Sequence, residues 1–184
     1  MLVEPPVYPI LRIETGMYTA PIIRIGVDAD NRFIVTGSHE KSVRIWDIYT
    51  GSLTKILRPP IGEENEGKIY AVAISPDGRT IACGGWTKAA ESFHNIYLFD
   101  RESGQLIRRI MGLPNVVLHL RYSQDGRYLI ATSSGRNGIR IYNAPDYSLI
   151  KEDKKYGSDC YGADFDRTNR LVTTSAGLSE ITIE

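Results

Sequence analysis

The sequence predicts an all-β fold built of stacked four-stranded antiparallel sheets. A 13-residue phrase occurs four times, as GVDADNRFIVTGS from Gly26, AISPDGRTIACGG from Ala73, RYSQDGRYLIATS from Arg121 and DFDRTNRLVTTSA from Asp164. Measured between their turn residues Asn31, Gly78, Gly126 and Asn169, the copies lie 47, 48 and 43 residues apart. This spacing is typical of repeat arrays. Each copy joins two alternating apolar segments by Asp-Asn, Asp-Gly or Thr-Asn, which predicts a β-hairpin.

The first repeat predicts four strands, named a to d in chain order, at residues 22–27, 32–38, 42–48 and 52–57. The connections at 29–31, 39–41 and 49–51 are so short that each strand must return antiparallel beside the one before it. The same pattern predicts strands at 68–74, 79–85, 95–100 and 105–110, and again at 116–122, 127–133, 138–143 and 148–153. Each sheet carries apolar residues on both faces, so consecutive sheets must stack, and radial stacking makes a β-propeller.

The chain is predicted to be one propeller domain, residues 1–184, with incomplete units at both ends. Residues 1–16, including YPILRIE at Tyr8–Glu14, resemble an orphan d strand. Three complete blades follow at 17–58, 59–112 and 113–156. Residues 157–184 supply strands at 161–166 and 170–176 and the start of a third at 181–184, so the fourth blade is predicted to be incomplete.

Three arrangements accommodate these two ends, and they differ in the mass expected in solution. The favoured one is the N-terminal part of a longer ring of about seven blades. Repeat arrays usually end in an atypical capping unit, whereas this sequence stops inside a predicted strand. In the second, two chains close an eight-bladed ring by exchanging their orphan strands, a self-association through the open blade ends. In the third, one chain closes a four-bladed ring.

The segment Val43–Asp47, VRIWD, ends the third strand of the first repeat and resembles the signature of the WD-repeat family. That resemblance implies a hydrogen-bonded set in each blade, formed by His, Asp, Ser or Thr, and Trp. In blade 1, Tyr18, Glu40, Ser42 and Trp46 are assigned to these four positions. Blade 2 has Asn95 and Phe99-Asp100 instead, and blade 3 has Gly138 and Tyr142-Asn143, so we expect the sheets to be kept without the polar network.

Composition excludes several classes of function. The 22 basic and 22 acidic residues balance, so neither nucleic acid nor a membrane surface is an expected partner, and Lys151–Lys155 mixes both signs as a surface segment does. The N-terminus lacks a secretory signal, and no stretch of 18 apolar residues occurs, which predicts a cytoplasmic protein. Cys83 and Cys160 are expected to be reduced and buried.

No catalytic, cofactor-binding or metal-binding set can be assigned from the sequence. His39, His94 and His119 fall in different blades and are interpreted as structural residues. The Asp-Gly pairs at Asp77 and Asp125 are explained by hairpin turns and lack the spacing of a calcium loop. We therefore predict no enzymatic activity and no cofactor.

The b–c connection of the second repeat, Trp86–His94, is about six residues longer than that of the first. In WD-repeat proteins these turns lie on the face that most often binds partners, and Trp and Phe are enriched at binding hot spots. Trp86 and Phe93 are therefore the predicted contacts for a protein or peptide partner, with His39, Arg136 and Asn137 from the corresponding turns. Local packing of both rings on their own blade is an equally weighted alternative.

The resemblance thus implies a non-enzymatic scaffold that presents a rigid surface for protein or peptide binding. The alternative is a part of a propeller enzyme of hydrolase or lyase type, or the non-catalytic repeat domain of a larger enzyme. Several inward-facing His, Asp or Glu residues from different blades would favour the enzyme.

Overall fold

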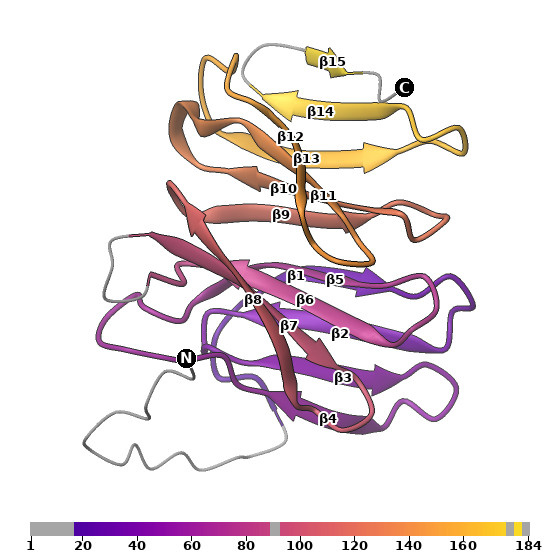
Figure 1. Cartoon of the computed structure of the whole chain (residues 1–184). Coiled ribbons are helices and arrows are strands. Elements are labelled where there is room, and N and C mark those ends of the chain that lie inside the picture. The colour runs from indigo at the N-terminus through magenta and orange to yellow at the C-terminus, as the bar shows by residue number, and fades with distance from the viewer. Residues whose placement is uncertain (1–16, 89–92, 176–178, 182–184) are drawn as a thin grey trace.

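Four antiparallel sheets make up the part of the chain that the structure, a computed structural model, describes: residues 17–88, 93–175 and 179–181. Figure 1 shows the sheets of β1 and β5 overlapping in the lower half of the view and those of β9 and β14 above them. Three sheets have four strands and the last has three, and in each the strands follow chain order. The predicted all-β fold of four-stranded antiparallel sheets is confirmed.

The strands of blade 1 are β1 (Ile22–Val27), β2 (Phe33–Ser38), β3 (Val43–Asp47) and β4 (Leu53–Leu57). Those of blade 2 are β5 (Ile69–Ile74), β6 (Thr80–Gly85), β7 (His94–Asp100) and β8 (Leu106–Leu113). Blade 3 has β9 (Val117–Tyr122), β10 (Tyr128–Ser133), the 3-10 turn η1 (Gly135–Asn137), β11 (Ile139–Asn143) and β12 (Leu149–Asp153). The fourth sheet has β13 (Cys160–Phe165), β14 (Leu171–Ser175) and β15 (Ser179–Ile181).

The a–b hairpins form because each turn contains one residue that tolerates a left-handed backbone. The φ angles of the four repeated turn residues are +53°, +73°, +73° and +62°, at Asn31, Gly78, Gly126 and Asn169. Gly adopts this region without strain and Asn more readily than other residues. The turn residues used to align the repeats are therefore the ones that the hairpins require.

Two strand boundaries differ from the sequence prediction by more than one residue. Strand β8 continues to Leu113 instead of ending at Ile110, because the ladder passes a register shift in which His94 pairs Leu113 and Ile96 pairs Ile110. Gly112, with a φ of +82°, supplies the backbone conformation at this bulge. The third strand of the last sheet begins at Ser179 rather than Ile181, whereas the orphan strand predicted within 1–16 lies outside the described residues.

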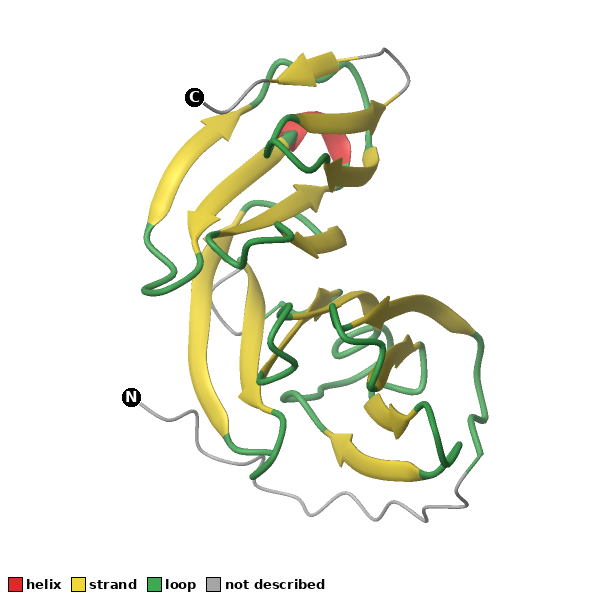
Figure 2. Cartoon of the chain, turned by 90° about the vertical axis from the view of Figure 1, so that its right-hand side faces the viewer, coloured by secondary structure: helices red, strands yellow, loops and turns green. Residues whose placement is uncertain are grey.

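Three apolar cores lie between successive sheets, and they hold the blades together. The core between blades 1 and 2 includes Val35, Ile45 and Ile81, and that between blades 2 and 3 includes Leu98 and Leu129. A third core, with Ile141 and Phe165, joins blade 3 to the fourth sheet. The innermost strands β1, β5, β9 and β13 contact one another in this order, so the sheets follow an arc, as Figure 2 shows.

Both cysteines lie in these cores as free thiols. Cys83 and Cys160 are fully buried, in agreement with the sequence prediction. Burial in an apolar core raises the pKa of the Cys160 thiol to about 11, against weaker opposing backbone hydrogen bonds at Gly162 and Thr174.

Candidate protein-interaction surface

The two ends of the sheets carry different connections. The a–b and c–d turns gather at the right-hand end in Figure 1, and the b–c turns and the d–a connections at the left-hand end. We call the latter the b–c end; it carries all five predicted contact residues, His39, Trp86, Phe93, Arg136 and Asn137.

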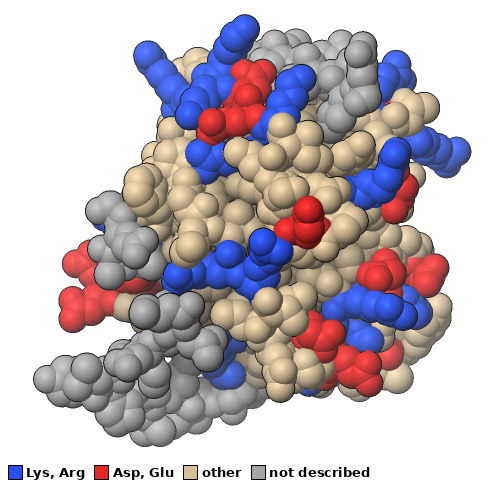
Figure 3. All heavy atoms as spheres, viewed as in Figure 1, with Lys and Arg blue, Asp and Glu red and all other residues tan. Residues whose placement is uncertain are grey.

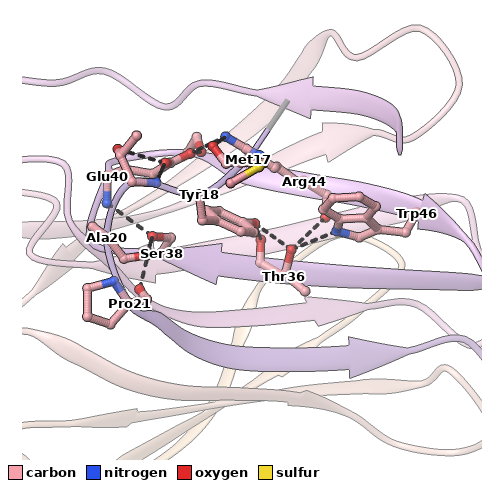
Figure 4. Close-up of polar contacts among 11 residues, drawn as sticks. Met17, Tyr18, Ala20, Pro21, Thr36, Ser38, Glu40, Arg44 and Trp46 are labelled. Carbon is pink, nitrogen blue, oxygen red and sulfur yellow. Dashed lines mark hydrogen bonds and ion pairs between the residues drawn. The ribbon is translucent and has the colours of Figure 1, made fainter. Parts of the chain in front are cut away.

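In blade 1 a polar network fixes the b–c turn, contrary to the expectation that no such network is kept. The Trp46 indole Nε1–H donates to Thr36 Oγ1 over 2.9 Å, and the Tyr18 hydroxyl makes a short hydrogen bond to the same Thr36 oxygen. Figure 4 shows Tyr18 and Trp46 approaching Thr36 from opposite sides. Tyr18 thus takes the position predicted for it, but the hydroxyl that meets the indole belongs to Thr36 and not to Ser42.

Ser42 instead belongs to a second group around Glu40. The Glu40 Oε1 atom accepts hydrogen bonds from Ser42 Oγ at 2.6 Å and from Arg44 Nη2 at 2.7 Å. Its other oxygen accepts the Thr19 backbone N–H at 2.8 Å. Burial alone would raise the pKa of Glu40, but these hydrogen bonds and the Arg44 charge outweigh it and lower the pKa. The Arg44 guanidinium also lies 4.1 Å from the Tyr18 ring centre, which joins the two groups.

Blades 2 and 3 lack this network, as predicted, because apolar residues occupy the position of Thr36. Cys83 in β6 and Ala131 in β10 stand at the matching place in the repeat, and both are fully buried in the cores between blades. Phe99 and Tyr142, which replace Trp46, lie in the same cores. These faces are covered by a neighbouring sheet, where a hydroxyl without a partner would be costly.

Substituting Thr36 by Val should lower the free energy of unfolding by about 1–2 kcal/mol, because it leaves the Trp46 indole N–H without its acceptor. Thr54→Val is the matched control: Thr54 Oγ1 donates to the Ile45 carbonyl at an exposed position, and its loss should cost less than about 0.5 kcal/mol. Urea unfolding followed by tryptophan fluorescence measures both. Equal costs for the two variants would show that the Thr36 hydroxyl has no special role.

The b–c connection of blade 2 is closed at its base by hydrogen bonds between Thr87 and Asn95. Thr87 Oγ1 donates to the Asn95 carbonyl at 2.5 Å, and Asn95 Nδ2 donates to the Thr87 carbonyl at 3.1 Å. An isolated bridge between Lys88 and His94 adds to this closure. Residues 89–92 of the predicted insertion lie outside the described residues.

Trp86 and Phe93 flank this closure with partly exposed rings. The exposed fractions are 39% for Trp86 and 50% for Phe93, so neither ring is a core residue. The Trp86 ring meets the His94 ring edge to face, with centroids 5.9 Å apart. His94 is buried below it, and that burial lowers its pKa despite a hydrogen bond to the Gly85 carbonyl. His94 therefore supports Trp86, in keeping with its predicted structural role.

His39 lies beside the same region but is less accessible. Its ring packs at 4.7 Å from that of Tyr70, and its Nε2 atom is buried without a hydrogen-bond partner among the described residues. Burial, and then the charge of Lys68, lower the pKa of His39. The segment that contains Lys68 pairs with the backbone of Trp86. The Trp86 N–H donates to the Lys68 carbonyl, and the Gly67 N–H donates to the Trp86 carbonyl. His39 and Trp86 thus flank one segment, Gly67–Tyr70.

The blade 3 residues form a separate group. Arg136 is exposed, whereas Asn137 is half-buried and its Nδ2 donates to the Ser134 carbonyl at 2.7 Å, which ties it to its own turn. Among the described residues, no hydrogen bond or ring contact joins either of them to the Trp86 region. The b–c end therefore offers one aromatic cluster, the Trp86–His94 ring pair with Phe93 beside His94 in the chain, rather than a site built from all five predicted contacts.

Groups of side chains suited to metal binding are absent among residues 17–88 and 93–175 and the backbone segment 179–181. Within the same ranges, no helix has the length and hydropathy needed to cross a membrane. The three histidines remain in different environments, as the sequence indicated, with His39 and His94 at the b–c end and His119 midway along β9.

The arc of radially stacked four-stranded blades defines the chain as a β-propeller protein. The family model described as "WD domain, G-beta repeat" matches residues 14–47 and 54–89. The Drosophila melanogaster protein named "Protein LST8 homolog" is 31% identical over 126 residues, covering 65% of this chain and 36% of the relative. The two matched repeats and this relative support a WD-repeat family for the chain.

Further similar proteins agree with this assignment. The Takifugu rubripes "WD repeat and SOCS box-containing protein 1" is 23% identical over 122 residues, which are 66% of this chain and 26% of the relative. The solved structure titled "Structure of U3-55K" has a TM-score of 0.73 at 19% identity and covers 86% of this chain and 47% of its own. The Kuenenia stuttgartiensis hydrazine synthase has a TM-score of 0.69 at 16% identity over 88% of this chain and 45% of its own, which shows the shared fold alone. The chain thus spans less than half the length of each of these proteins.

Proposed function

We propose that this chain is a non-enzymatic scaffold whose b–c end binds a segment of a partner protein, with Trp86 and Phe93 as the anchoring side chains. The observation that carries the proposal is the pair of half-exposed aromatic rings at the base of a loop fixed by Thr87 and Asn95. Rigid aromatic rings lose little entropy on binding and dominate many interfaces. WD-repeat relatives support a protein-interaction role for the fold as a whole.

The surroundings of Trp86 favour a partner segment with an apolar side chain flanked by basic residues. The d–a connection that precedes β5 carries Glu63 and Glu64, both exposed. This connection is joined to Trp86 by the Gly67 N–H to Trp86 carbonyl hydrogen bond of 2.7 Å. Exposed carboxylates on a connection that is bonded to the aromatic anchor contribute specificity for Lys or Arg and speed association.

Nucleic acid and membranes are not part of the proposed function. On the face drawn in Figure 3, basic and acidic side chains lie interspersed, without a continuous basic surface. The balanced charge of 22 basic and 22 acidic residues supports the same view. We propose that the protein works in the cytoplasm, on the sequence grounds given above.

We also propose that further blades complete the ring beyond the fourth sheet. Leu171 and Thr173 point into the core shared with blade 3 and are fully buried, whereas Val172 between them is 55% exposed on the opposite face. Another sheet, from a longer chain or a second copy, would cover this face as its neighbours are covered. Light scattering of the purified 184-residue chain should give a mass above that of one chain; a stable monomer would contradict the proposal.

Ligands for the proposed surface can be selected from a random peptide library displayed on phage, with the whole chain as target. Peptides so obtained should lose at least about tenfold in affinity against the Trp86→Ala and Phe93→Ala variants, because hot-spot aromatics contribute about 2 kcal/mol or more. Isothermal titration calorimetry measures the dissociation constants.

Tyr49→Ala is the matched control, since Tyr49 is 78% exposed in the c–d turn of blade 1, at the other end of the sheets. It should leave binding unchanged. Circular dichroism melting establishes that each variant is folded. Peptides that bind the Trp86 and Phe93 variants as tightly as the unchanged chain would refute the proposed surface.

A further inference from the structure

A cavity of about 450 Å³ lies where the innermost strands of the first three blades converge. Strand β1 lines it with Ile25 and Val27, β5 with Ala73, and β9 with His119 and Arg121. We call it the channel cavity. Its volume is in the range of sites that bind small molecules, and it lies apart from the aromatic cluster at the b–c end.

Arg24 of β1 does not itself line this cavity, but it reaches across the arc to β9, where its charge acts on the lining residue His119. The Arg24 Nη2 atom donates to the carbonyl of Leu118 in β9 at 3.1 Å and lies 3.4 Å from that of Tyr161 in β13. Its Nε atom is buried, and no described residue accepts a hydrogen bond from it. No carboxylate of the described residues pairs with this guanidinium, although a partly buried cation is normally paired.

His119 adds a hydrogen-bond donor. Its Nδ1 atom accepts the backbone N–H of Ala163 at 3.0 Å, so in the neutral ring the proton is carried by Nε2. Burial, and then the charges of Arg24 and Arg121, lower the pKa of His119 to about 4. The ring is therefore neutral at pH 7, and among the described residues none accepts a hydrogen bond from Nε2.

The charges around the cavity do not cancel. Arg121 Nε pairs with Asp164 Oδ1 at 2.9 Å, and the same carboxylate oxygen also accepts the Phe165 N–H. Asp28, which also lines the cavity, is paired with Arg32. Asp164 is therefore the carboxylate left for the two guanidinium groups of Arg24 and Arg121, which leaves one uncompensated positive charge and a free imidazole N–H. Two guanidinium groups and an N–H donor are the set that binds oxyanions through charge-assisted hydrogen bonds.

We propose that the channel cavity binds a small molecule bearing a phosphate or carboxylate group, held by Arg24 and by the His119 Nε2–H, with Arg121 at its edge. The anion supplies the missing counter-charge, and it links blade 1 to blades 3 and 4 through the residues that already meet there. No reaction is implied, because the set contains no nucleophile. Binding stabilises the folded arc, since a ligand specific for the folded state adds to its stability.

The test is a titration of the whole chain at pH 7 with inorganic phosphate and, separately, with succinate, against sodium chloride at matched ionic strength. Nitrogen-15 NMR of the histidine side chains should show saturable shifts of the His119 signals and a rise in the His119 pKa. The acid that saturates at lower concentration identifies phosphate or carboxylate as the preferred group. Shifts no larger than those in sodium chloride, for both acids, would overturn the proposal.

Arg24→Gln should weaken binding by about tenfold or more, the effect of losing a charge-assisted hydrogen bond. Arg79→Gln is the control, because the Arg79 side chain is 82% exposed in the a–b turn of blade 2 and its loss should change nothing. An equal loss in both variants would mean non-specific attraction and would reject the site. Should Arg24→Gln fail to fold, Arg121→Gln and the His119 titration of the unchanged chain decide the question.

Discussion

Gly138→Ala is expected to lower the free energy of unfolding by about 4 kcal/mol or more, enough to unfold a typical domain of this size. Gly138 ends the b–c turn of blade 3 with φ +61° and ψ −131°, a conformation that only glycine adopts freely. An added Cβ would overlap the carbonyl oxygen of Asp153 and lie 2.7 Å from Tyr156 Cδ2. Backbone strain and steric overlap therefore act together at this position.

Gly51→Ala separates these two effects. Gly51 also has a left-handed φ, +67°, but nothing lies within 4 Å of the added Cβ, so its cost should be only about 1 kcal/mol. Urea denaturation of both variants gives the comparison. A Gly138→Ala variant as stable as Gly51→Ala would mean that β12 and Tyr156 move aside without penalty.

Acidification from pH 6.5 towards pH 4 is expected to remove up to about 3 kcal/mol of stability through His119. Its pKa is about 4 in the folded chain and 6.5 ordinarily, with burial as the main cause. The unfolded chain therefore binds more protons in this window, and the stabilisation is complete above pH 6.5 and lost as the pH falls through 4. His39 and His94, whose pKa values burial also lowers, add to the loss in the same direction.

The carboxylates act at lower pH and do not obscure this effect. Hydrogen bonds from Thr168 and Arg170 hold the pKa of Asp166 far below its usual range, so its contribution disappears only below about pH 4. His119→Gln should flatten the dependence of stability on pH between 6.5 and 4. An NMR titration that places the His119 pKa near 6.5, or an unchanged slope in the variant, would disprove the assignment.

The strands and hairpins could be predicted because two local signals agree in every repeat. Alternation of apolar residues sets the strands, and Asn31, Gly78, Gly126 and Asn169 supply the left-handed turn residues. The extension of β8 to Leu113 escaped prediction, because a bulge at Gly112 interrupts the alternation that marks a strand.

The blade 1 network was only half predictable, for a geometric reason. Ser42 and Trp46 share one face of β3, but four residues of extended chain separate them by about 13 Å. Thr36 lies opposite Arg44 in the β2–β3 ladder, on the same face as Trp46, and this cross-strand pairing brings the hydroxyl to the indole. A single strand read alone does not reveal it.

Arg24 gave a weaker sequence signal. It is the one charged residue in IIRIGV, an otherwise apolar innermost strand, and such a charge could have been flagged as inward-facing. Its partners lie in blades 3 and 4, at Leu118 and Tyr161. That meeting depends on the curvature of the whole arc, which no local pattern specifies.

The hydrogen bonds between Thr87 and Asn95 affect which sequence changes this protein can tolerate during evolution. Because the two residues satisfy one another, with the Lys88–His94 bridge beside them, the loop that joins β6 to β7 is closed at its base. Substitutions or insertions in that loop therefore carry little risk for folding, whereas loss of Thr87 or Asn95 carries much more. Mutations in this loop can therefore change the binding specificity while the blade that carries the loop keeps its structure.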